Sequence, residues 1–300
     1  MLEGAKVLVT GATGQVGLPV ARTLASRNEV WALARFKDQG ARQALEEAGV
    51  RCCTVDLSSG QLDGLPDDFT HVANFAVAKS SNFQRDLAIN AESVGFLMSH
   101  CRSARAFLHC SSTAVYQPNG HHRFKETDPL GDNHRLVLPS YSISKIAAEA
   151  VARFGAKHWN LPTTIARLNV PYGDNGGWPA LHLDWMLAGV PIALHADKPN
   201  LFNPIHEDDI VEQVPKLFEI ADVPAVVLNW AGKDQVSMEE WCEFLGRLVG
   251  VEPKLAYTTQ AIASVTTDNT LMHQLIGQTR VPWREGMERM ARARHPELFG

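Results

Sequence analysis

Short apolar runs alternate with longer segments of helical periodicity through the first 170 residues of the chain. The apolar runs are rich in Val, Leu and Ala and have the length of strands buried on both faces of a sheet. Segments of crossover length separate them, which is typical of a parallel sheet covered by helices. The pattern predicts a doubly wound α/β fold, with strands at 6–10, 29–34, 51–55, 71–76, 106–110, 163–167 and 225–230 and helices at 15–27, 41–48, 83–102 and from about 140.

The pattern becomes irregular after residue 170, where Gly- and Pro-rich segments separate predicted helices at 178–187, 238–248 and 283–294. Ligands of doubly wound folds bind at the carboxyl edge of the sheet, and a small second unit placed there would cover them. We therefore expect a Rossmann-type nucleotide-binding domain over 1–170 and a smaller substrate-binding cap formed mainly by 171–300. The predicted strand at 225–230 would return to the sheet.

Composition and charge narrow the class of protein. The chain has 300 residues, of which 45% are hydrophobic and 20% charged, enough apolar material for a buried core. A net charge of −5 argues against nucleic acid as a partner, and no apolar run has the length of a membrane span. The five cysteines include no Cys-x-x-Cys pair, which indicates neither a disulfide framework nor zinc. We expect a cytoplasmic protein without a secretory signal, membrane contact or bound metal.

The first predicted strand leads into a glycine-rich turn. The turn reads Thr10-Gly11-Ala12-Thr13-Gly14-Gln15-Val16-Gly17 and precedes a predicted helix. Glycines at this spacing allow a tight turn and the close approach of a pyrophosphate, while the helix N-terminus offers free N–H groups. An ordinary glycine-rich turn is the alternative, but the position in the first strand–helix unit favours dinucleotide binding.

The end of the second predicted strand bears on which dinucleotide is bound. A carboxylate there would hydrogen-bond the adenosine ribose and favour NAD. The segment Ala34-Arg35-Phe36-Lys37 has no acid, and Arg35 could pair with a 2′-phosphate. The alternative for Arg35 is a solvated cation at a strand end. We expect NADP as the cofactor, with NAD as the alternative.

A tyrosine and a lysine, Tyr141 and Lys145, stand four residues apart and share one face of a predicted helix. An adjacent ammonium favours the phenolate form, which acid–base chemistry near neutral pH requires. Ser112 follows the fifth predicted strand and would lie at the carboxyl edge, where it could hold a carbonyl oxygen. Serines at strand ends more often cap a turn. Together with the glycine turn, however, the three residues favour hydride transfer assisted by a tyrosine.

These motifs as a set resemble an extended short-chain dehydrogenase/reductase of the NAD-dependent epimerase/dehydratase group, over most of the chain. The resemblance implies that Ser112, Tyr141 and Lys145 are catalytic and that Asn90 holds the active site together. It implies cofactor contacts from Gly11, Thr13, Gly14, Gln15, Val16, Gly17, Asp56, Leu57, Asn74, Phe75, Ala76, Tyr141, Lys145, Asn169 and Val170, in addition to Arg35. We expect substrate contacts from Ser112, Tyr172, Trp178 and His182.

The segments that would bind substrate depart from the family pattern. Sugar-nucleotide epimerases usually have Arg-Asp where this chain has Phe202-Asn203, and that Arg meets the nucleotide phosphates. Lys198 is the only Lys or Arg from residue 174 to 201, so a diphosphate lacks an obvious counter-charge. Trp178 and its apolar neighbours could line a pocket, or could belong to an amphipathic helix packed in the core.

We therefore expect an NADP(H)-preferring oxidoreductase that transfers hydride between the nicotinamide and a carbonyl or secondary alcohol of a small, largely apolar molecule. The alternative is a nucleotide-sugar epimerase with tightly bound NAD, which would use the same Ser, Tyr and Lys. A non-catalytic nucleotide-sensing protein is disfavoured, because such proteins typically lack the Tyr–Lys pair. The resemblance also implies a homodimer formed through the helices near 83–102 and 140–155.

Overall fold

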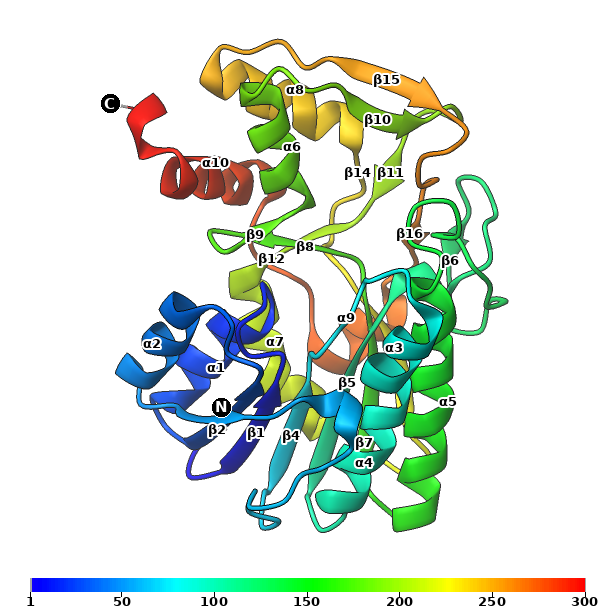
Figure 1. Ribbon diagram of the computed structural model, residues 1–300. Coiled ribbons are helices and arrows are strands. Elements are labelled where there is room, and N and C mark those ends of the chain that lie inside the picture. The colour runs from blue at the N-terminus through cyan, green and yellow to red at the C-terminus, as the bar shows by residue number, and fades with distance from the viewer. Residues whose placement is uncertain (1, 300) are drawn as a thin grey trace.

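A seven-stranded sheet forms the centre of the protein, a computed structural model of which describes residues 2–299 (Figure 1). The strands lie in the order β3 (Arg51–Thr54), β2 (Glu29–Ala34), β1 (Lys6–Thr10), β4 (His71–Asn74), β5 (Ala106–Ser112), β7 (Thr163–Leu168) and β13 (Val226–Trp230). All neighbours in this sheet are parallel. The predicted doubly wound α/β fold is confirmed, and each strand begins and ends within two residues of its predicted range.

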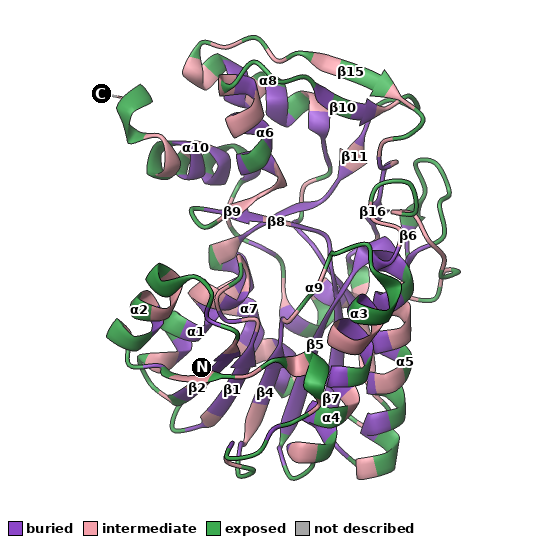
Figure 2. Cartoon of the chain, viewed as in Figure 1, coloured by how far each residue is buried: buried purple, intermediate pink, exposed green. Residues whose placement is uncertain are grey.

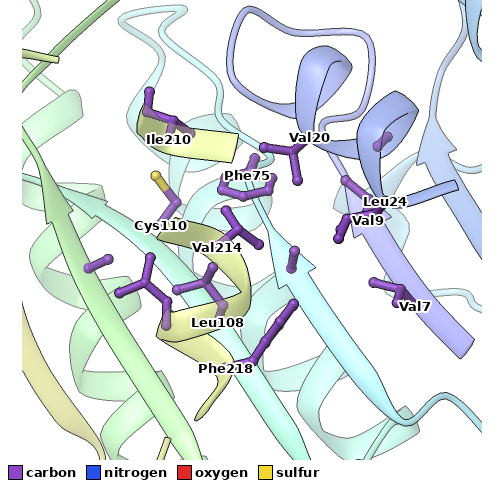
Figure 3. Packing of buried hydrophobic residues seen from close by; sticks show 14 of the residues in the cluster. Val7, Val9, Val20, Leu24, Phe75, Leu108, Cys110, Ile210, Val214 and Phe218 are labelled. Atoms are coloured by element: carbon purple, nitrogen blue, oxygen red, sulfur yellow. The ribbon is translucent and has the colours of Figure 1, made fainter. Parts of the chain in front are cut away.

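Side chains along each strand point alternately to the two faces of the sheet, and both faces are apolar. Helices therefore cover both faces of the sheet. Val7 and Val9 point into a layer shared with α1 (Gly17–Ala25) and α7 (Glu207–Glu219), as Figure 3 shows. Leu8 points the other way, into the layer formed by α4 (Ser93–His100) and α5 (Tyr141–Trp159). The remaining helices of this lobe are α2 (Gln39–Glu47) beside α1 and α3 (Phe83–Leu87), which continues through a π-helical turn, Ala88–Glu92, into α4.

Two helices of the C-terminal third belong to this lobe and were not predicted from the sequence. In α7, Ile210, Val214 and Leu217 stand at helical spacing and enter the core layer against β5 and β7. Pro215 lies inside this helix and masks the pattern, because proline ordinarily breaks a helix interior. The second helix, α9 (Thr270–Ile276), packs against β13 and α7.

The cap forms the upper lobe in Figure 1, around α6 (Trp178–Leu187), α8 (Met238–Val249) and α10 (Trp283–Arg294). These three helices match their predicted ranges, and their inward faces are buried (Figure 2). None of the helices in residues 2–299 has the length and apolar character needed to cross a membrane. Short strands complete the structure, namely β6 (Arg123–Phe124), β8 (Val170–Gly173), β9 (Gly176–Gly177), β10 (Ile192–His195), β11 (Leu201–Phe202), β12 (Pro204–His206), β14 (Val236–Ser237), β15 (Leu255–Thr258) and β16 (Thr266–Thr267).

Candidate active site

The glycine turn joins β1 to α1 at the carboxyl edge of the sheet. Gly11 has a φ of +64°, and a Cβ there would come within 2.7 Å of the backbone of Phe75 and Ala76. A Cβ on Gly17 would come within 2.3 Å of the Gly11 carbonyl oxygen, so only glycine permits this approach of helix to turn. No side chain caps the N-terminus of α1. The Leu18 N–H donates to the Gly14 carbonyl (3.0 Å) and Pro19 has no N–H, so the N–H groups of Val16 and Gly17 are the ones that an anion could bind.

The cap contacts this turn directly. The Gln15 side-chain amide donates a hydrogen bond to the carbonyl of Pro171 (2.8 Å), in strand β8. The Asn175 side-chain amide donates to the carbonyl of Gln15 (3.2 Å). Strand β8 and the turn that follows it therefore help to fix the conformation of the glycine turn.

A cavity of about 270 Å³ opens beside the turn and collects the three predicted catalytic residues. Tyr141 is the first residue of α5, and Lys145 stands one helical turn later. The Lys145 ammonium donates to the carbonyl of Cys110 (2.8 Å), at the end of β5. Ser112 closes the same strand, and its hydroxyl accepts the N–H of Ala114 (3.2 Å). Gly11, Gly14, Gln15, Val16, Gly17, Phe75, Asn169 and Val170 line the cavity as well.

Asn90 does not line the cavity but connects two of the segments that form it. It lies in the π-helical turn between α3 and α4, where it is buried. Its side chain exchanges hydrogen bonds with the backbone N–H (2.6 Å) and carbonyl (2.9 Å) of Ala78. It also donates to the hydroxyl of Ser144 (2.8 Å), the residue before Lys145. Asn90 thus fixes the loop after β4 against the helix that presents Tyr141 and Lys145.

A buried ion pair between Arg167 and Glu149 also holds helix α5 in place. This pair was not predicted from the sequence. Arg167 on β7 makes two hydrogen bonds to the Glu149 carboxylate, at 2.9 and 2.8 Å. Glu149 stands one turn after Lys145, and it also accepts the hydroxyl of Ser111 (2.6 Å), next to Ser112. Arg167 also donates to the hydroxyl of Tyr116 (3.1 Å) and to the carbonyl of Glu126 (3.0 Å). The pair therefore links α5, β5 and β7 where the catalytic side chains emerge.

The other predicted cofactor residues lie around the turn but outside the cavity lining. Asn74 is buried at the end of β4, and its side-chain oxygen accepts a hydrogen bond from the Thr10 hydroxyl (2.5 Å). The same hydroxyl accepts the N–H of Ala76 (3.3 Å). Arg35 is exposed at the end of β2, and Asp56 caps the short turn that begins at Leu57. Hydrogen bonds from Ser58, with a smaller contribution from Arg35, lower the pKa of Asp56. Thr13 lies in the glycine turn.

Two polar cavity residues, Lys79 and His134, were not predicted. The Lys79 ammonium lies 5.0 Å from the centre of the Tyr141 ring. The His134 ring lies 5.6 Å from that ring and is stacked with Trp178 at 6.4 Å. Burial, with Lys79 adding to it, lowers the pKa of His134 to about 3, so the imidazole is neutral. Both residues lie in irregular loops, which carry no periodic pattern that would have marked them.

Of the predicted substrate residues, Ser112 and Trp178 line the cavity, whereas Tyr172 and His182 lie in the core of the cap. Tyr172 is 1% exposed, and its hydroxyl donates to the carbonyl of Trp283 (3.3 Å). His182 is buried and accepts the indole N–H of Trp241 (2.9 Å). Their side chains are occupied by the packing of β8 and α6 against α8 and α10. Neither side chain lines the cavity, and substrate contact at these two positions stays a prediction.

The site suits a dinucleotide more than it suits a metal ion. The backbone of Gly11 and Gly14 and the N-terminal end of α1 would cradle a pyrophosphate, and Tyr141 and Lys145 line the same cavity. In residues 2–299, no three His, Cys, Asp or Glu side chains are placed to hold a metal ion. Phe75, the glycine turn and Val170 would contact the cofactor, and Ser112 and Tyr141 would face the substrate.

Comparison with known protein sequences finds a matching family and relatives of this chain. The sequence profile of the NAD dependent epimerase/dehydratase family matches residues 7–212. The spore coat polysaccharide biosynthesis protein SpsK of Bacillus subtilis is 26% identical over 94% of this chain and 95% of its own. A dTDP-4-dehydrorhamnose reductase of Burkholderia thailandensis is 32% identical, over 53% of this chain and 49% of its own.

The fold also matches a solved structure over almost its whole length. UDP-glucuronic acid 4-epimerase from Bacillus cereus, in complex with UDP-glucuronic acid and NAD, superposes with a TM-score of 0.85. The superposition covers 97% of this chain and 99% of the epimerase, at 20% sequence identity. Both lobes described above are therefore present in that structure.

Proposed function

Because this chain belongs to the NAD dependent epimerase/dehydratase family, we propose that it is an epimerase that acts on a sugar linked to a nucleotide and retains NAD. The observation that carries the proposal is the convergence of Ser112, Tyr141 and Lys145 with the glycine turn in one cavity. The full-length likeness to a UDP-glucuronic acid epimerase supports a nucleotide sugar over the small apolar molecule favoured from the sequence. In this proposal the enzyme works as a homodimer.

The chain's own residues would handle the proton of the reacting hydroxyl. When bound, the dinucleotide supplies the chemistry of accepting and returning hydride. Tyr141 would take the proton from the sugar hydroxyl and later give it back, while Ser112 holds the same oxygen. The Lys145 ammonium donates a hydrogen bond to the Cys110 carbonyl (2.8 Å). Its positive charge lies one helical turn from Tyr141, the proposed acid–base group. Asn90 and Glu149 hold α5 so that both groups stay at the cavity wall.

A reductase of nucleotide-linked keto sugars that uses NADP(H) is the second candidate, and one specific observation favours it. The exposed Arg35 ends β2 where a carboxylate would be expected for NAD. A guanidinium at this place could pair with a 2′-phosphate. The 32% identity with a dTDP-4-dehydrorhamnose reductase is consistent with that chemistry.

The nucleotide that the purified protein carries separates the two candidates. An epimerase returns its hydride to the same substrate and need not release the cofactor, whereas a reductase must exchange it at every turnover. We expect denaturation of the freshly purified protein to release NAD in near-stoichiometric amount, identified by mass spectrometry. An empty protein, or one that carries NADP, would contradict the epimerase and favour the reductase.

A further inference from the structure

A second hollow adjoins the active-site cavity, and His134 lies in the wall of both. It has a volume of about 410 Å³. One side is formed by the loop 132–137 of the Rossmann lobe, and the other by His195, Thr259 and residues 261–263 of the cap. Asn133 fixes the partition, because its side-chain amide donates to the carbonyl of Thr113 (3.3 Å), at the active site. A ligand that extends from Tyr141 past His134 would enter this hollow.

Few cations are available to a diphosphate on this path. Among residues 2–299, the cations that line the two hollows are Lys79, Lys145 and Arg135. Lys145 donates to a backbone carbonyl, and Lys79 lies over the ring of Tyr141. On the cap side, the Lys198 ammonium lies 3.4 Å from the centre of the Tyr257 ring and lines neither hollow. The second hollow has Arg135 as its cation, in the described part of the chain.

Arg135 is free to bind an anion. Its side chain is exposed, and within residues 2–299 it makes no ion pair or hydrogen bond. A guanidinium presents several donors in one plane and binds phosphate oxygens in pairs, which a solvated lysine does less well. The loop before α5 therefore places a cation opposite the cap, where the family pattern has its arginine on the cap.

An acceptor accompanies this cation in the same wall. The Oδ1 atom of Asp132 is enclosed and has no hydrogen-bond partner among the described residues. A buried carboxylate oxygen without a donor is costly, so a ligand that brings hydroxyl or N–H groups would be favoured there. The hollow thus offers a positive group and an unsatisfied acceptor a few residues apart. A nucleoside diphosphate has the matching parts, since its phosphates are anionic and its ribose carries hydroxyl donors.

We infer that Arg135 binds the diphosphate of the nucleotide-linked substrate in the second hollow, while Asp132 accepts hydrogen bonds from the nucleoside. The sugar then passes His134 and reaches Tyr141. This assignment rests on the proposed function, since it needs a nucleotide on the substrate. It moves the specificity-determining cation from the cap to the loop that precedes the catalytic helix.

Titration calorimetry with UDP tests the assignment on protein saturated with NAD, so that the cofactor site cannot take up the probe. Removing a charged hydrogen-bonding partner should raise the Kd of UDP about 10-fold or more in Arg135→Gln. Uridine, which has no phosphate, should bind Arg135→Gln with the wild-type Kd. Arg153→Gln, an equal change of charge at an exposed site on α5, should leave both Kd values unchanged.

The other outcomes distinguish failure of the Arg135 assignment from failure of the proposed function. If UDP binds the wild type and Arg135→Gln equally well, Arg135 does not bind the diphosphate, and the epimerase proposal stands without it. If Arg135→Gln weakens uridine as much as UDP, the residue only shapes the hollow, and the assignment is wrong. If the wild type binds neither probe, the nucleotide-sugar function itself fails, and the assignment fails with it.

Discussion

At the residue scale, Tyr141 is the group on which the proposed chemistry depends. The Lys79 ammonium and the His134 imidazole both lie beside its ring, contacts that a phenylalanine would keep. The hydroxyl, by contrast, is the acid–base group. Tyr141→Phe therefore removes proton transfer and leaves the cavity wall in place.

We expect Tyr141→Phe to bind NAD as the wild type does and to lose at least ~100-fold in kcat, the usual scale for a positioned acid–base group. Turnover of a UDP-linked hexose and the nucleotide content after denaturation check the two halves separately. Val77→Ala, at an exposed residue of the cavity wall, serves as a control for a mild change of shape. Near-normal kcat in Tyr141→Phe would overturn the assignment of the base.

Single functional residues could be predicted from the sequence where they lie on a regular helix or at the end of a strand. Tyr141, Lys145 and Ser112 lie on a helix and at a strand end, where position along the element determines position in space. His134 and Arg135 lie in a loop without periodicity, and the cap determines what they face. Tyr172 shows the converse. The family resemblance of its segment suggested a substrate contact, whereas the packing of β8 against α10 buries its side chain.

At the scale of elements, helix α5 serves two purposes. One face presents Tyr141 and Lys145 to the cavity and Glu149 to Arg167. The opposite face carries an apolar stripe at spacings of four, three and four residues, formed by Ile143, Ala147, Ala150 and Phe154. Ile143 is 42% exposed and Phe154 is 59% exposed. An exposed apolar stripe on a long helix is typical of a surface that packs against another helix.

We therefore propose that two copies pair through this stripe of α5. Phe154→Glu would place a charge in the interface, and we expect it to halve the molar mass measured by analytical ultracentrifugation at micromolar concentration. Leu275→Glu, at an exposed position of α9, should leave the mass unchanged. A wild-type mass equal to that of a single chain would contradict the pairing.

Prediction of whole elements succeeded where an apolar pattern ran through the whole element. The seven sheet strands are nearly continuous apolar runs, and the cap helices α6, α8 and α10 carry enough apolar positions to mark them, so all of these elements lie where expected. The short cap strands do not, because two- to four-residue strands carry too few positions to show a period. Helix α7 has the period, but Pro215 conceals it.

At the scale of the whole molecule, buried and partly buried histidines make folding depend on pH. His109 lies on β5 of the Rossmann lobe, and His182 lies on α6 of the cap. His134 lies in the wall that the two hollows share. Burial lowers the pKa of all three, to about 4 in His182. The unfolded chain binds protons at these sites below about pH 6.5, while the folded chain keeps them neutral. Stability is therefore complete above that pH and is lost as the pH falls toward the folded-state values.

For His182 alone, the free energy of unfolding should fall by about 2 kcal/mol between pH 7.5 and 5. Urea denaturation at the two pH values measures the loss. His182→Gln keeps an acceptor for the Trp241 indole and does not titrate, so its loss over the same range should be smaller by that amount. An equal loss in the two proteins would show that His182 is not the group that titrates.

The chain passes several times between the two lobes, which affects how a cap could be exchanged between related enzymes. After β7 the chain builds α6 in the cap, returns with α7 and β13, leaves again with α8, and comes back with α9 before it ends in α10. The cap is therefore not one continuous segment of the chain. Removal of all residues after 170 would also remove the edge strand β13 and the helices α7 and α9 from the Rossmann lobe. A new substrate range can be transplanted only with everything after β7, or be acquired one side chain at a time.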